Sequence, residues 1–371
     1  MTDLFEPVTA WADQLAAATP GFAAQLCVIH EGRLAVDCAV GVVADSVTGV
    51  YSSSKGVAAM VVALLVQEGR LDLDAPVARY WPEFAAAGKA DILVRHLLSH
   101  QAGLPGVVGG FTSDEFSHSE LAAARLAAAQ PFWRPGAAFG YHGLTIGVFM
   151  EELVRRITGT ALQSVYDEVF RRPHELDFFL GLPAGLDHRY RPLLEPLAAP
   201  TPAAAARFTL AADGYNATVF APEADGLTVW ERAPLPNQAA VRRAGWAAAG
   251  GVGSARGLAE AYAVAYGGYR GRPPLIGEAV RSAMAQEQVF GQDRVLGRQM
   301  AFGVVYMRPQ PALDFGSYRA LGHDGAGGAI GYYDPFYDVA AAYIPQHLET
   351  PGDGLPNALQ FSRVVRSCLA P

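Results

Sequence analysis

Ser52 and Lys55 are the residues whose types and spacing most clearly indicate chemistry. They stand three positions apart, directly before the apolar run GVAAMVVALLVQ. A serine hydroxyl is a weak nucleophile until a neighbouring base removes its proton. On a helix, a lysine three residues further on lies on the same face as the serine, and its amine is a base when neutral. The pair therefore indicates a nucleophilic serine activated by lysine; the alternative is a capping serine followed by a surface lysine.

Lysine is rare in this chain. Of 28 Lys and Arg residues in 371, only Lys55 and Lys89 are lysines. Arginine stays protonated in proteins, whereas a desolvated lysine can lose its proton. A helix that is apolar on every face belongs in a domain interior, and both burial and a second cation would lower the pKa of Lys55. We therefore expect a buried helix, capped by the serines and ended by Gly69, whose N-terminal N–H groups suit an oxyanion.

Two further segments have the composition of a reaction centre. The Pro- and Gly-rich segment 133–143 contains Tyr141, which would relay a proton if its phenol lay between cations. The alternative is a core tyrosine with a satisfied hydroxyl. The segment 322–328, GHDGAGG, lies between strand-like sequences, and its glycines let another group approach the backbone closely. Its alternative is a tight turn.

The order of the expected elements indicates the fold. A β-hairpin is expected over 24–42, helical pieces over 74–172, irregular structure over 192–236, strands between 301 and 346 and a final helix over 357–369. Strands at both ends with helices between them predict an α/β (α+β) fold. We expect a discontinuous α/β domain, an antiparallel sheet flanked by helices, formed by residues 1–75 and 240–371. Residues 76–239 are expected to form a mostly helical insert domain.

These motifs, in this order, resemble those of the serine β-lactamase and penicillin-binding-protein superfamily. The most similar branch is the class C β-lactamase-like family, which includes the family VIII carboxylesterases. The resemblance is carried by SSSKGVAAMVVALLVQEGRLDLDAPVARYWPEF, VRHLLSHQAGLP and WRPGAAFGYHGLTIGVFMEELVRRITG. It runs from about residue 22 to 343 and is weakest over 176–239. It implies a β-lactamase/transpeptidase-like fold with a cleft where the two domains meet.

The resemblance also implies roles for individual residues. Ser52 would be the acylated nucleophile, Lys55 its base, and Tyr141, in the place of the Y-x-N tyrosine, the proton relay. The backbone N–H groups of Ser52 and Ala326 would form the oxyanion hole.

The sequence departs from the family pattern at two places that concern substrate binding. Gly143 replaces the asparagine of Y-x-N, whose amide contacts a β-lactam. His323-Asp324-Gly325 replaces K-T-G, and a histidine is mostly neutral at pH 7. Both changes favour neutral esters over β-lactams. Nearby aromatic residues would line an apolar substrate pocket: Trp133 and Phe139 above all, with Phe111, Phe132, Tyr332 and Tyr333. The alternative is that they pack in the core, which explains most such residues.

Other classes of function lack support in the sequence. No basic stripe indicates nucleic-acid binding, and no apolar run is long enough to span a membrane. Acidic residues near the start and three cysteines without C-x-x-C predict a cytoplasmic, reduced protein. His96 and His100 have the spacing of a helical zinc site but no acid between them, so we expect structural histidines. No G-x-S-x-G or nucleotide-binding motif occurs, and we expect no cofactor and no metal.

The leading hypothesis is a cytoplasmic serine hydrolase that cleaves small carboxylic esters through an acyl-Ser52 intermediate. An acyltransferase that uses the same intermediate is one alternative, and a β-lactamase or D,D-peptidase is another. The remaining alternative is a non-catalytic binding protein of the same fold.

Overall fold

The two ends of the chain build one five-stranded antiparallel sheet. The structure is a computed structural model that describes residues 4–198, 214–220, 234–349 and 356–370. The order of the strands across the sheet is β2 (Arg33–Val40), β1 (Ala24–His30), β10 (Val339–Pro345), β9 (Ile330–Asp334) and β8 (Leu321–Asp324). β1 and β10 are buried almost throughout, because helices cover both faces of the sheet.

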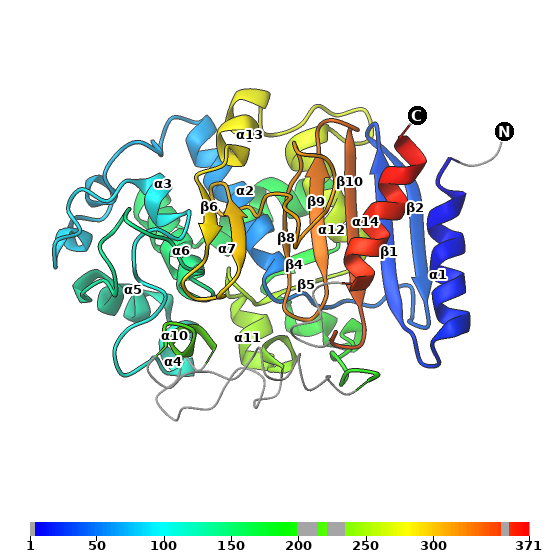
Figure 1. The fold of residues 1–371 in the computed structure, drawn as a ribbon, viewed down its shortest axis with the longest axis horizontal. Helices are drawn as coiled ribbons and strands as arrows, with labels where there is room; N and C mark the ends of the chain where they lie inside the picture. Colours follow the sequence, from blue (N-terminus) through cyan, green and yellow to red (C-terminus); the bar gives the residue numbers. More distant parts are fainter. Residues whose placement is uncertain (1–3, 199–213, 221–233, 350–355, 371) are drawn as a thin grey trace.

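Alternate residues of β10 identify the two faces, since successive side chains of a strand point in opposite directions. Ala341 and Tyr343 pack in one core cluster with residues of α1 (Glu6–Ala18) and α14 (Pro356–Leu369). Ala340 and Ala342 pack in a second cluster with α12 (Ala255–Tyr262). Figure 1 shows α1 and α14 beside the sheet, near both chain ends, α12 against β9 and β10, and α3 to α6 on the opposite side of the molecule.

The helix α2 (Ser53–Gln67) lies between the sheet and this helical side, in contact with β8, α6 and α7. All its residues from position 53 to 63 are buried, as expected for a helix that is apolar on every face. Gly69, with φ of +67°, follows its end. The expectation of serine capping is wrong: Ser52 makes no capping bond, whereas Ser53 donates to the carbonyl of His323 and Ser54 to that of Tyr51.

The remaining elements surround α2 and the sheet. The helices are α3 (Val94–Leu97), α4 (Ser113–Ser117), α5 (Ser119–Ala128), α6 (Thr145–Thr158), α7 (Leu162–Tyr166), α8 (Arg172–His174), α10 (Ala217–Phe220), α11 (Ala239–Ala244) and α13 (Glu278–Ala285). The short strands are β3 (Thr48–Gly49), β4 (Phe178–Leu180) and β5 (Gly251–Gly253), which form one sheet, and the hairpin β6 (Val289–Gln292) and β7 (Gln299–Phe302). The described residues also form four 3₁₀ segments (Val77–Arg79, Pro82–Ala85, Ala184–Arg189, Leu235–Asn237) and two π-helical turns (Asp167–Arg171, Ala263–Gly267).

The expected fold class is confirmed: an antiparallel sheet flanked by helices, built from both ends of the chain, with helices between. The segment 74–84 differs, because it forms two 3₁₀ turns where a helix was expected. Pro76 and Pro82 each lack an N–H and cannot continue an α-helix. The division at residues 75 and 239 stays a prediction. Among the described residues, no helix is both long and apolar enough to cross a membrane.

Candidate active site

Two side chains expected to act with Ser52, those of Lys55 and Tyr141, converge on its Oγ. Ser52 stands at the N-terminal end of α2, and the Lys55 Nζ lies 2.8 Å from its Oγ. The hydroxyl of Tyr141, from the loop before α6, donates to the same Oγ at 2.9 Å. Ser52 is partly exposed, whereas Lys55 has no exposed surface and Tyr141 has 6%. The serine can therefore meet a ligand while its two partners stay enclosed.

Burial sets the proton affinity of Lys55. It lowers the pKa of the amine to about 7, and the Asp324 carboxyl opposes this shift. The expected burial of Lys55 is confirmed, and burial shifts the pKa of its amine in the expected direction. Among the described residues no second cation assists the shift: the charged group that acts on Lys55 is a carboxyl, so burial alone lowers the pKa. Near neutral pH a large share of Lys55 is an uncharged amine, which can accept a proton from Ser52.

A backbone carbonyl that the sequence did not reveal fixes the Lys55 amine. Lys55 Nζ donates to the carbonyl of Ala248 at 2.8 Å, just before β5. The preceding residue, Ala247, donates its N–H at 2.8 Å to Oε1 of Glu151, a partly buried side chain of α6. The amine is thus held between Ser52 Oγ and a carbonyl whose own segment is anchored to α6.

Tyr141 is held as a neutral phenol. Burial raises its pKa above the usual value for tyrosine, and the Asp324 carboxyl adds to the shift. Its ring stacks on Phe302 at a centroid distance of 6.1 Å, and Lys55 Nζ lies 5.2 Å from the ring centroid. A protonated phenol at hydrogen-bond distance from Ser52 is a proton donor, and it can be reprotonated by a neighbouring acid.

The turn after β8 lies against the N-terminal end of α2. A Cβ on Gly325 would come within 2.2 Å of the Val50 carbonyl oxygen, so only glycine allows this approach. Tyr51, directly before Ser52, has a φ of +45°, a strained conformation for a non-glycine residue. Within the described residues, neither the N–H of Ser52 nor that of Ala326 makes a hydrogen bond to the protein. Both donors are therefore available to an oxyanion.

Gly143 lies behind Tyr141, where Val219 of α10 covers it. A Cβ at this position would come within 2.3 Å of Val219 Cγ1. Trp133 and Phe139 are buried in the same apolar cluster as Tyr141 and Val219, and their role as walls of a substrate pocket stays a prediction. No specific signal in the sequence indicated Val219, which lies in the region of weakest family resemblance.

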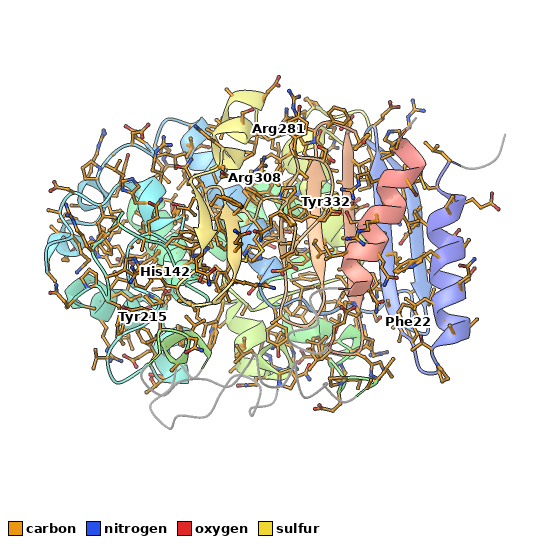
Figure 2. All side chains as sticks on the ribbon, viewed as in Figure 1. Phe22, His142, Tyr215, Arg281, Arg308 and Tyr332 are labelled. Carbon is orange, nitrogen blue, oxygen red and sulfur yellow. The ribbon has the colours of Figure 1, made fainter. Side chains whose placement is uncertain are left out.

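The other aromatic candidates have different partners. Phe111 contacts Phe116, Tyr332 is bonded to Ser362 and Tyr333 to Asp338. Phe132, next to Trp133, packs against Tyr215, which also contacts Trp133. Figure 2 shows Tyr215 on the helical side of the molecule and Tyr332 on the sheet.

His323 and Asp324, which replace the first two residues of K-T-G, have different surroundings. The His323 ring has no exposed surface, its Nδ1 lies 2.7 Å from the Asp324 carbonyl, and burial lowers its pKa to about 3. It is therefore neutral and enclosed, so a bound substrate would meet Asp324 instead, whose side chain keeps 14% of its surface exposed. The carboxyl of Asp324 has a raised pKa because it is mostly buried.

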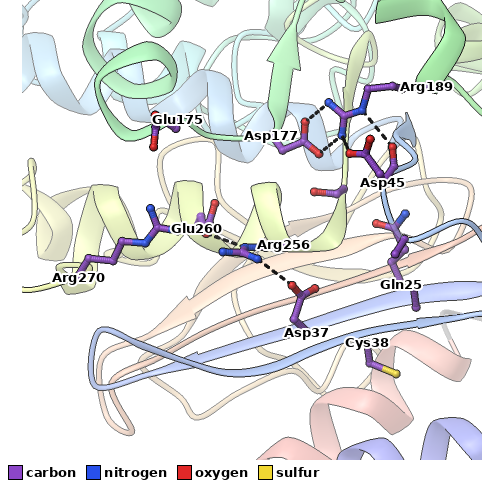
Figure 3. A pocket seen from close by; sticks show the side chains of 13 residues that line it. Gln25, Asp37, Cys38, Asp45, Glu175, Asp177, Arg189, Arg256, Glu260 and Arg270 are labelled. Atoms are coloured by element: carbon purple, nitrogen blue, oxygen red, sulfur yellow. Dashed lines mark hydrogen bonds and ion pairs between the residues drawn. The ribbon is translucent and has the colours of Figure 1, made fainter.

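The remaining candidates for binding carry no chemistry connected with Ser52. The backbone N–H of His142 donates to His100 Nδ1 at 3.0 Å, and the described residues hold no group of three or more His, Cys, Asp or Glu suited to a metal ion. A cavity of about 560 Å³ lies between β2 and α12, away from Ser52 (Figure 3). Its arginines pair with its carboxylates: Arg189 with Asp177, and Arg256 with Asp37 and Glu260. We assign no function to it.

Comparisons with known proteins found a matching family and several similar proteins. The model of the family described as "Beta-lactamase" matches residues 8–361. Esterase/beta-lactamase LipL of Mycobacterium tuberculosis is 35% identical over 318 residues, which cover 83% of this chain and 71% of LipL. The structure of EstA from Arthrobacter nitroguajacolicus Rue61a is similar with a TM-score of 0.90 and 43% identity, covering 99% of this chain and 96% of EstA. The crystal structure of a family VIII carboxylesterase is similar with a TM-score of 0.85 and 30% identity, covering 99% and 98% of the two chains.

Proposed function

The chain belongs to the beta-lactamase family, and on this premise we propose that it is a carboxylesterase-type hydrolase whose nucleophile is Ser52. The family match confirms the resemblance identified in the sequence. Relatives named as esterases and carboxylesterase, at 30% to 43% identity, support ester hydrolysis. The observation that carries the mechanism is the convergence of Lys55 Nζ and the Tyr141 hydroxyl on Ser52 Oγ, at 2.8 Å and 2.9 Å.

In the proposed acylation step, Ser52 Oγ attacks the carbonyl carbon of the ester while its proton passes to neutral Lys55. The backbone N–H groups of Ser52 and Ala326 hold the developing oxyanion. When the bond to the leaving oxygen breaks, the Tyr141 hydroxyl gives its proton to that alkoxide, and the Lys55 ammonium reprotonates Tyr141. The alcohol leaves, and the acyl group stays on Ser52.

In the proposed deacylation step, a water molecule takes the place of the alcohol. As the water attacks the acyl carbon, it gives a proton to Tyr141 while Tyr141 passes its own proton to neutral Lys55. When the ester bond to Ser52 Oγ breaks, the Lys55 ammonium gives its proton to that oxygen. The products are the carboxylic acid and the free enzyme.

The proposed substrates are small neutral esters. Asp324 places a carboxyl where K-T-G has a hydroxyl, and His323, in the place of the lysine, is neutral. The carboxylate of a penicillin would meet the Asp324 carboxyl there in place of the lysine and hydroxyl of K-T-G, and the cation that acts on Asp324 from outside this motif is Arg298. Gly143 offers no side chain for an acylamino group, and Val219 fills the space beside it.

Burst kinetics test the proposed function. We expect p-nitrophenyl butyrate to give a rapid release of p-nitrophenolate equal to the enzyme concentration, followed by steady turnover. Mass spectrometry of the quenched enzyme should find a butyryl group on the peptide that contains Ser52. Ser52→Ala should lose both signals, with Ser53→Ala as a matched control that leaves the convergence on Ser52 intact.

Two results would contradict this proposal. An unchanged burst in Ser52→Ala would exclude Ser52 as the nucleophile. Nitrocefin hydrolysis as fast as p-nitrophenyl butyrate hydrolysis would contradict the preference for neutral esters and favour a β-lactamase.

A further inference from the structure

The backbone of Tyr141 is held by a carboxylate from a distant part of the chain. Asp293, in the turn between β6 and β7, accepts the N–H of Tyr141 on its Oδ1 at 3.1 Å. The side chain of Asp293 is buried, with 0% of the residue exposed. A buried carboxylate costs free energy unless its bonds compensate, so this contact needs an explanation.

The turn itself fixes the carboxylate. Oδ1 of Asp293 also accepts the N–H groups of Val295 and Leu296, each at 2.8 Å. The backbone of Asp293 is bonded across the turn, donating to Arg298 at 2.9 Å and accepting from Gly297 at 3.0 Å. A turn-forming aspartate needs only these local bonds. The bond to Tyr141 is an addition, and together with the bond of the Arg294 N–H to the Phe139 carbonyl at 3.1 Å it joins the turn to the reaction centre.

Other contacts hold the two neighbours of Tyr141 and its ring, so the Tyr141 N–H cannot turn to another acceptor when the bond to Asp293 is lost. On either side of it, Gly140 donates to the carbonyl of His100 and His142 to His100 Nδ1, both at 3.0 Å. The Tyr141 ring packs against the rings of Phe302 and His100, at centroid distances of 6.1 Å and 5.1 Å, and Tyr141 is only 6% exposed. Since the ring is enclosed, the position of the hydroxyl follows the position of the Tyr141 backbone.

We propose that Asp293 is a positioning residue that fixes the Tyr141 backbone so that the hydroxyl stays in place to protonate the leaving alkoxide. The inference rests on the proposed role of Tyr141 in acylation. A displacement of about 1 Å in a reacting group can cost roughly 100-fold in rate. Without Asp293, the Tyr141 N–H also becomes a buried donor with no partner, which favours such a displacement.

The leaving group provides a readout that a purely structural role would not change. An ethoxide ion needs a proton as it leaves, whereas p-nitrophenolate is stable without one. For ethyl butyrate and p-nitrophenyl butyrate the acyl group is the same, and kcat/KM reports acylation for both. A weaker proton donor therefore lowers kcat/KM for the ethyl ester more than for the aryl ester.

The test variant is Asp293→Ser. Its hydroxyl can accept the turn N–H groups, but it is too short to reach Tyr141. We expect kcat/KM to fall about 30-fold for ethyl butyrate and no more than about threefold for p-nitrophenyl butyrate. Asp293→Asn keeps an oxygen for all three N–H groups and should retain the wild-type ratio. Asp293→Thr makes the same turn bonds and replaces Asp293→Ser if that variant does not fold.

Asp334→Ala is the matched control. Asp334 is also buried, and it accepts from Ser317 Oγ at 2.7 Å and from the Phe336 N–H at 3.0 Å, at the far end of β9. Its loss should lower stability and leave the ratio of the two kcat/KM values unchanged.

The outcomes separate this inference from the proposed function. Tyr141→Phe should show the same change in ratio as Asp293→Ser. If Tyr141→Phe leaves the ratio unchanged, the proposed role of Tyr141 is wrong and the premise is lost. If Tyr141→Phe changes the ratio while folded Asp293→Ser does not, only the inference about Asp293 is overturned. A full change of ratio in Asp293→Asn would also overturn it.

Discussion

Lys55→Met is expected to stabilise the protein at neutral pH while it abolishes esterase activity. The pKa of the amine falls from 10.5 to about 7 on folding, because Lys55 is buried. At about 1.36 kcal/mol for each pK unit, keeping the amine neutral costs roughly 4 kcal/mol at pH 7. Methionine removes this cost but also the bonds to Ser52 and Ala248, worth about 1 kcal/mol each. The expected net gain is about 2 kcal/mol of unfolding free energy.

The pH dependence of this gain follows from the sign of the pKa shift. Between pH 10.5 and pH 7 the unfolded chain binds a proton on Lys55 that the folded protein does not. The unfolding free energy of the wild-type protein therefore falls as the pH falls through this range, and that of Lys55→Met lacks this contribution. The variant should be the more stable protein at pH 7 and the less stable one above pH 10.5. The two curves should cross near pH ~9.

Urea unfolding of both proteins at pH 7, 8, 9 and 10 measures these curves, with the slopes compared to detect changes in the unfolded state. Lys89→Met is the matched control, since its amine donates to the Ala129 carbonyl and not to Ser52. The control should keep its esterase activity. A Lys55→Met variant that is less stable than the wild type at every pH would refute the argument that burial holds this amine neutral.

Three further predictions test the geometry. In the wild type, kcat/KM should rise with pH around a midpoint near 7, as Lys55 loses its proton. Lys55→Arg should lower kcat/KM as much as Lys55→Ala does, because arginine keeps its charge. Gly143→Asn should lower the unfolding free energy by about 1 to 3 kcal/mol, since its Cβ meets Val219 Cγ1 at 2.3 Å, and Val219→Ala should recover part of the loss. Gly325→Ala should lower kcat about 100-fold, because its Cβ would lie 2.2 Å from the Val50 carbonyl oxygen and would move the Ala326 N–H. Gly185→Ala is the control and should leave kcat unchanged, because nothing lies within 4 Å of a Cβ there.

The sequence predicted the parts of the site that lie close together in the chain. Ser52 and Lys55 are one helical turn apart, so the register of a helix is enough to predict that they meet. The apolar residues after Lys55 predicted its burial, and burial predicted the direction of its pKa shift. The pairing of the first strands with the last followed from strand-like segments at both ends of the chain.

The parts that the sequence did not reveal depend on contacts between distant segments. The carbonyl of Ala248 is a backbone group, which has no residue-type signature. Asp293 stands in an ordinary turn sequence, and its bond to Tyr141 joins positions 152 residues apart. The second cation expected near Lys55 followed from general chemistry, and the fold instead places the Asp324 carboxyl there.

Direct titration of Lys55 tests the central claim, that a neutral amine activates Ser52. Because the chain has only two lysines, labelling with ε-¹³C lysine gives two side-chain signals, and Lys89→Met assigns them. We expect the chemical shift of the Lys55 signal to titrate with a midpoint near pH 7. A midpoint near 10.5, the ordinary value for lysine, would show an ammonium group at neutral pH and contradict the proposed mechanism.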